Sequence, residues 1–190
     1  MIHLLATLRL RAKLLVGFGA VLVLCAAVGA YAVRSIGDTS AQAAVIAERW
    51  LPAVERSGAV NGAIADARIK HYRYLSAVDE SAIAESRRLV AEQHARVRAM
   101  RGDLARHLHD AEARRLAGAF DREWGAYLRA FARIDSLQFQ ANDPLGALGL
   151  MLGGARVEFD RAQATLAALA RHNRDAANAA SAAAAAGFRT

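Results

Sequence analysis

The chain has 190 residues, of which 55% are hydrophobic but only 6% are aromatic, and it contains two prolines and one cysteine, Cys25. The net charge of +7 comes almost entirely from arginine, and no block of like charge with interleaved aromatics is present, which excludes a basic nucleic-acid groove. A single cysteine excludes an internal disulfide and a multi-cysteine metal site, and the abundance of alanine favours helices.

The first predicted element is an uncharged apolar run at residues 14–33. At 1.5 Å per residue, a run of this length crosses the roughly 30 Å hydrocarbon core of a bilayer. Arg9, Arg11 and Lys13 precede it, so the positive-inside rule places residues 1–13 in the cytoplasm and residues 34–190 outside. The alternative is a cleaved signal peptide, because residues 30–32 form a small-x-small triplet. We expect a retained anchor, and both interpretations export the rest of the chain.

Helix-start signals divide the exported region into four predicted helices. The candidate N-caps are Asp79 or Ser81, Asp110, and Asn142 or Asp143, the last followed by Pro144. The predicted helices span about residues 34–78, 80–108, 110–140 and 143–188. Apolar residues recur at alternating steps of three and four, the period of near-parallel packed helices. Short connections make neighbours antiparallel, so the predicted fold is all-α, an N-terminal transmembrane helix followed by an up-down-up-down four-helix bundle.

Two of the predicted core seams contain polar residues. The seam of the first helix includes Ile46, Ala67, His71, Tyr74 and Val78, and that of the last includes Leu148, Leu152, Ala155, Phe159 and Asn173. We interpret His71 as a packed histidine rather than a ligand group, and Asn173 as a buried residue that sets helix register.

The chain resembles the N-terminal region of methyl-accepting chemotaxis proteins that carry a four-helix-bundle sensor domain. The resemblance rests on the anchor "RLRAKLLVGFGAVLVL", Leu51-Pro52, the basic "ARIKHYR" and the last-helix segment "GARVEFDRAQATLAALARHNRDAA". It implies a periplasmic, dimeric bundle on the bacterial inner membrane that binds amino or organic acids at the dimer interface and signals through its last helix. The 190 residues contain no HAMP segment and no methylation helices, so we expect a sensor fragment or truncated receptor.

The basic stretch "ARIKHYRYL", residues 67–75, is the candidate ligand site. Arg68 and Arg73 lie about 140° apart around one helix, so they cannot clasp one small anion together. Two copies of the helix side by side would let Arg68 of one face a shared space with Arg73 of the other, and guanidinium pairs well with carboxylate. The resemblance implies ligand-binding arginines at these two positions, and a third falls on Ala77.

Two further residues complete the candidate ligand-binding set, namely Tyr72 and Met151. Met151 belongs to residues 148–156, the apolar stretch that we expect opposite the two arginines, so an anion with an apolar body suits the site better than aspartate. We expect Lys70 to be solvated.

Other chemistry finds little support in the sequence. His107 and His109 are two residues apart, so on a helix they point in opposed directions and do not chelate one metal together. No phosphate loop or nucleophile elbow occurs, and we expect no enzyme activity, no metal and no cofactor. The expected partners are a small organic acid or amino acid, a second copy of the chain and the membrane, with a periplasmic binding protein as a further partner. The alternatives are the sensor domain of a histidine kinase or diguanylate cyclase, or an anchored structural bundle without a ligand.

Overall fold

The structure is a computed structural model that describes residues 10–45 and 50–186, with side chains at 17–34 and 50–183. In these residues every regular element is a helix, which confirms the predicted all-α class. Helix α2 (Leu10–Val45) contains one segment, Gly17–Arg34, that is long and apolar enough to cross a membrane, and its side chains are not buried within the structure. The predicted seam residue Ile46 lies outside the described residues.

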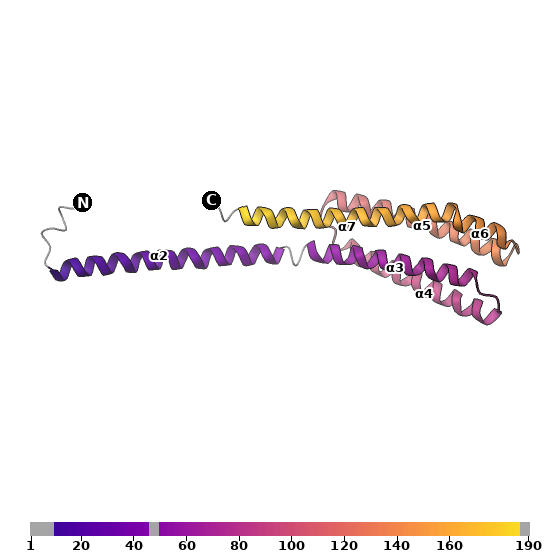
Figure 1. The fold of residues 1–190 in the computed structure, drawn as a ribbon, viewed down its shortest axis with the longest axis horizontal. Helices are drawn as coiled ribbons and strands as arrows, with labels where there is room; N and C mark the ends of the chain where they lie inside the picture. The colour runs from indigo at the N-terminus through magenta and orange to yellow at the C-terminus, as the bar shows by residue number, and fades with distance from the viewer. Residues whose placement is uncertain (1–9, 46–49, 187–190) are drawn as a thin grey trace. The chain divides into compact units, whose positions relative to one another are not determined.

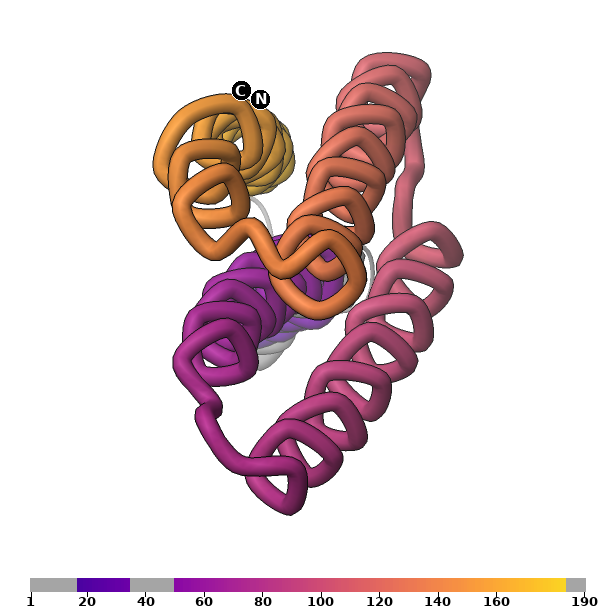
Figure 2. The backbone as a smooth tube through the Cα atoms, turned by 90° about the vertical axis from the view of Figure 1, so that its right-hand side faces the viewer, coloured from indigo at the N-terminus to yellow at the C-terminus, as the bar shows by residue number. Residues whose placement is uncertain are grey.

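Residues 50–180 form the bundle. Its helices are α3 (Leu51–Leu75), α4 (Glu80–Ala105), α5 (Ala111–Phe139), α6 (Pro144–Leu152) and α7 (Gly154–Ala186). Figure 1 shows that α3 and α4 run in opposite directions, as do α5 and the α6–α7 column, and Figure 2 looks along these four columns. The up-down-up-down bundle that the sequence predicts is therefore present.

The bundle helices begin at the predicted signals. Asp79, Asp110 and Asp143 are the N-caps of α4, α5 and α6, and their carboxylates accept hydrogen bonds from the amides of Ala82 (2.7 Å), Ala113 (2.7 Å) and Gly146 (2.9 Å). Pro52 and Pro144 lie in the first turns of α3 and α6, where a missing amide hydrogen costs nothing. Each cap satisfies an otherwise unpaired backbone donor and so fixes where its helix starts.

The core follows the predicted seams along most of its length. Helix α5 contributes most of the buried aromatic side chains, namely Phe120, Trp124, Tyr127 and Phe131. Helix α7 faces them with its own buried seam of Ala155, Phe159, Ala162, Leu166 and Leu169. Asn173 is buried on the same seam, as the sequence predicts.

The predicted seams are wrong at the tip of the bundle. Val78 is 93% exposed because α3 ends at Leu75, and Leu148 and Leu152 are about half exposed while Ala147 and Met151 are buried instead. The cause in the last column is a break at Gly153, whose ψ of −101° departs from helical geometry and separates α6 from α7. This break shifts the phase of the seam by one residue, so one continuous last helix is replaced by two.

Candidate functional site

The outward face of α3 is formed by small residues and apolar side chains. Gly58, Gly62, Ala65, Ile69 and Tyr72 follow one another at alternating steps of four and three, which places them on one side of the helix, opposite the buried seam. Ile69 is 67% exposed, and a Cβ placed on Gly58 or Gly62 would meet no atom within 4 Å. The face is therefore open along more than three turns of α3.

Arg68 lies at one border of this face and reaches across to α7. Its Nη1 donates to Oδ1 of Asp160 at 3.2 Å, and its guanidinium carbon lies 4.4 Å from the centroid of the Phe159 ring and 5.8 Å from that of Tyr72. A cation over an aromatic face gains electrostatic energy, so Phe159 and Asp160 together hold this guanidinium. The bond to Asp160 uses one of its five N–H donors.

The sequence prediction for the residues opposite Arg68 is wrong by about one helical turn. It places residues 148–156 there and finds no polar partner, whereas the structure brings Phe159 and Asp160 to the guanidinium. The prediction pairs Val78 with Asp143 at the tip, but α3 ends at Leu75, which shifts the two columns along each other. Gly153 and Gly154 are predicted to admit a close backbone, but a Cβ placed on either would meet only atoms of α6, at Gly149 and Leu150.

Arg73 lies at the other border of the outward face, towards α4. Its side chain is exposed, and its charge contributes to keeping the pKa of Glu85 below the usual value, after the larger effect of the hydrogen bond from Arg88. Within one chain, Arg68 and Arg73 therefore point away from each other, as the sequence predicts.

Tyr72 and Met151 line one cavity of about 250 Å³ between α3, the end of α5 and α6. Leu75, Pro144, Ala147 and Leu148 add apolar wall, and Ser76 and Gln138 provide polar groups. Met151 is otherwise buried, with an exposed fraction of 1%. The structure thus places Tyr72 next to Arg68 and in one cavity with Met151, whereas Arg73 takes part in neither contact.

A series of three hydrogen-bonded polar side chains, one each from α3, α4 and α5, lies inside the bundle. His71 is fully buried on α3; its Nδ1 lies 2.7 Å from Oη of Tyr127 on α5, and its Nε2 lies 2.7 Å from Nε2 of His94 on α4. The ring of Phe131 stacks on the His71 imidazole at 3.6 Å between centroids. Burial, and then the facing His94, lower the pKa of His71 to about 3, so the imidazole is neutral. Burial also lowers the pKa of His94 and raises that of Tyr127.

The sequence alone indicates only part of this series of hydrogen-bonded side chains. His71 falls on a predicted core seam, and its burial confirms the packed interpretation. Tyr127 falls on the α5 seam, and His94 interrupts the weaker α4 seam. Two histidines that break the apolar pattern of adjacent antiparallel helices are a signal that could have paired them.

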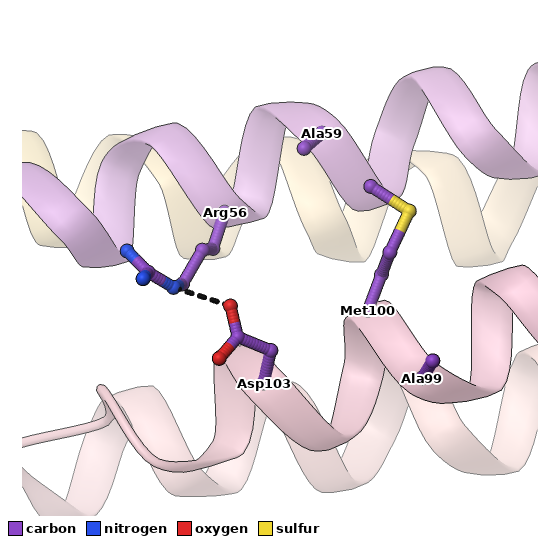
Figure 3. Close-up of a pocket in the computed structure, with 5 residues that line it drawn as sticks. All are labelled: Arg56, Ala59, Ala99, Met100 and Asp103. Carbon is purple, nitrogen blue, oxygen red and sulfur yellow. Dashed lines mark hydrogen bonds and ion pairs between the residues drawn. The ribbon is translucent and has the colours of Figure 1, made fainter.

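A second cavity, of about 320 Å³, lies between α3 and α4 (Figure 3). Arg56 and Asp103 close one end through a hydrogen bond of 2.6 Å from Arg56 Nε, and Ala59, Ala99 and Met100 line the rest. Its two charged side chains are already paired with each other, and none of the predicted ligand-binding residues reaches it.

The histidines that could suggest a metal do not come together. Nδ1 of His107 contacts the carbonyl of Asp103 at 2.9 Å, and His109 packs its ring edge against Trp50 at 5.8 Å between centroids. Among the described residues, no group of three or more histidine, cysteine or acidic side chains is arranged to hold a metal ion.

Comparison with known proteins identifies the class of the bundle. A family model described as a four helix bundle sensory module for signal transduction matches residues 7–188. No curated protein matches the chain.

Proposed function

The chain belongs to the four-helix-bundle sensory modules of methyl-accepting chemotaxis proteins, and from this membership we propose that it is the ligand-sensing region of a transmembrane chemoreceptor. The family is a sensory signal-transduction module and not a catalytic domain. In the proposed arrangement residues 1–13 are cytoplasmic, residues 14–33 span the bacterial inner membrane and residues 34–190 are periplasmic. The ligand is a small organic anion or amino acid, bound between two copies of the bundle.

The outward face of α3 supports a homodimer. Its steps of three and four are those of a coiled-coil seam, with Gly62 and Ile69 at one kind of seam position and Ala65 and Tyr72 at the other. The two glycines and Ala65 would let a second helix approach closely, and Ile69 would bury its exposed apolar side chain on pairing. Such burial contributes about 25 cal/mol for each Å² of apolar surface removed from water.

The positions of Arg68 and Arg73 support an anion site in that dimer. They flank the seam on opposite sides and are five residues apart, which is the spacing of side chains that face each other across a parallel coiled coil. Arg68 of one protomer would then meet Arg73 of its partner. Two guanidinium groups that face each other repel, and a carboxylate between them would offset the repulsion and accept hydrogen bonds from both.

The cavity behind Tyr72 suits the rest of the ligand. Tyr72 lies between Arg68 and the 250 Å³ cavity that contains Met151. A carboxylate held by the arginines could therefore direct an apolar tail past Tyr72 towards Met151. This arrangement favours an anion with an apolar body.

Helix α7 would receive the signal through Asp160 and Phe159. The ligand carboxylate competes with Asp160 for Arg68, and its binding weakens a contact that joins α3 to α7. A ligand shifts such an equilibrium only by its difference in affinity for the two states, and the exchange of Asp160 for ligand supplies that difference.

The experiment is a thermal-shift screen of the chain in detergent micelles with organic acids and amino acids. Arg68→Ala and Arg73→Ala should each weaken a stabilising compound about tenfold or more, as expected for loss of a charge-assisted hydrogen bond. Arg161→Ala is the matched control, because this exposed arginine of α7 pairs with Glu158 of its own helix. Ile69→Glu should give monomers that no longer bind. A compound that still binds Arg68→Ala with wild-type affinity would refute the site, and tight binding by the Ile69→Glu monomer would refute the shared interface.

A further inference from the structure

A groove of about 360 Å³ lies between α4 and α5. In it, one positively charged and one negatively charged side chain both hydrogen-bond to the hydroxyl group of Tyr74. Tyr74, almost wholly buried on α3, donates its phenolic hydrogen to Oδ1 of Asp135 on α5. The same oxygen accepts hydrogen bonds from Nε (3.2 Å) and Nη2 (3.0 Å) of Arg87 on α4. Within the described part of the chain, Oδ2 of Asp135 and Nη1 of Arg87 make no further hydrogen bond.

The remaining walls of the groove are mostly apolar. They consist of Val90 and Ala91 from α4 and Leu128, Phe131 and Ala132 from α5. Cavities of this size, with apolar walls and a few converging polar groups, are typical of small-ligand sites. The groove lies within one subunit and shares no lining residue with the cavity behind Tyr72.

We propose that this groove binds a free amino acid with an apolar side chain, with the ligand carboxylate on Arg87, its ammonium group on Oδ2 of Asp135 and its side chain against Val90, Leu128 and Phe131. Arg87 and Asp135 both hydrogen-bond to the Tyr74 hydroxyl group, so their opposite charges lie close together, as do the two charges of a zwitterion. A carboxylate pairs with the guanidinium fork, and an ammonium group donates to the free carboxylate oxygen. A ligand with only one charge leaves one of these two groups without its partner.

His94 connects this groove to the centre of the bundle. It lines the groove and contacts His71, which contacts Tyr127, and the Tyr127 ring lies 5.3 Å from the Phe159 ring of α7 between centroids. A bound amino acid would therefore contact the first residue of a packed series that ends at α7. The proposal takes its purpose from the sensory role proposed above, and its chemistry from the groove alone.

Calorimetric titration of the full chain in nanodiscs tests the proposal, with L-leucine, L-valine and L-phenylalanine as probes. At least one should bind with one molecule per chain. For leucine, two matched analogues each lack one charge: 4-methylpentanoate has no ammonium group and 3-methylbutylamine has no carboxylate. Each should bind at least about tenfold more weakly, as expected for loss of a charge-assisted hydrogen bond.

Variants separate this site from the α3 face. Arg87→Leu and Asp135→Asn should each weaken binding about tenfold or more, and the asparagine keeps an acceptor for the Tyr74 hydroxyl, so the fold is retained. Arg88→Leu, next along α4 and paired with Glu85 and Glu92 on the exposed surface, is the control that should bind normally. The proposal is overturned if no probe binds, if the singly charged analogues bind as well as leucine, or if Arg68→Ala abolishes binding while Arg87→Leu does not, the last outcome supporting the α3 site instead.

Discussion

Replacing His71 with glutamine should remove most of the pH dependence of stability between pH 7 and pH 5. In the folded chain the pKa of His71 is lowered to about 3, first by burial and then by His94. In the unfolded chain the imidazole has its ordinary pKa of about 6.5. The unfolded state therefore binds more protons between these two values, and the free energy of unfolding falls as the pH is lowered from about 6.5 towards 3.

The size of the effect follows from the same two pKa values. A difference of one bound proton changes the free energy of unfolding by about 1.4 kcal/mol for each pH unit, so His71 alone lowers it by about 2 kcal/mol between pH 7 and pH 5. The lowered pKa of His94 acts in the same direction. The carboxylates titrate mainly below this window.

Urea unfolding in detergent micelles, followed by the fluorescence of the buried Trp124, measures the effect. The wild type should lose at least about 2 kcal/mol between pH 7 and pH 5, and His71→Gln should lose about 2 kcal/mol less than the wild type. Tyr127→Phe is the control: it removes the hydroxyl group that contacts His71 but keeps the imidazole, so it should lower stability at both pH values and retain the pH dependence. Equal slopes for the wild type and His71→Gln would show that His71 is not a buried neutral histidine.

Two further substitutions test the packing and the caps. Phe159→Ala should lower the free energy of unfolding by about 3–5 kcal/mol, because the side chain is 3% exposed and its removal leaves a cavity between α3, α5 and α7. Val157→Ala, on the exposed side of α7, is the control. Similar urea midpoints for the two variants would contradict the assigned core. Asp110→Ala should lower the free energy of unfolding by about 1–2 kcal/mol, because Asp110 caps α5 and also holds His172 of α7 at 3.0 Å, and the double variant with His172→Ala should show less than the sum of the two single losses.

The sequence predicts which face of each helix is buried better than it predicts how far one helix is shifted along another. Periodicity places His71, Tyr74 and Phe159 on core seams, and all three are buried. Which residues of two neighbouring helices lie opposite each other depends on where each helix ends, and the turns set those ends. Because α3 ends at Leu75, Arg68 meets Asp160, a partner that the sequence did not suggest.

For the candidate ligand residues too, the sequence predicts the direction of each side chain but not its contacts with other helices. The outward direction of Tyr72 and the divergence of Arg68 from Arg73 follow from 100° per residue, and the structure retains both. Met151 is buried and reaches Tyr72 only through a cavity that forms where α6 packs on α3, which no local pattern encodes. Their role in binding stays a prediction until a ligand is tested.

The break at Gly153 would determine how far the proposed movement of α7 is transmitted. An uninterrupted helix carries an axial displacement along its full length, because every residue is tied to the residue four positions on. Here the helical backbone angles are interrupted at Gly153, and α6 packs into the core through its own buried side chains, Ala147 and Met151. The fourth column therefore consists of a short segment, α6, and a longer one, α7, joined at Gly153. Under the proposed signalling, a shift of α7 would be taken up at this joint, so it would be transmitted towards residue 186 and not into α6.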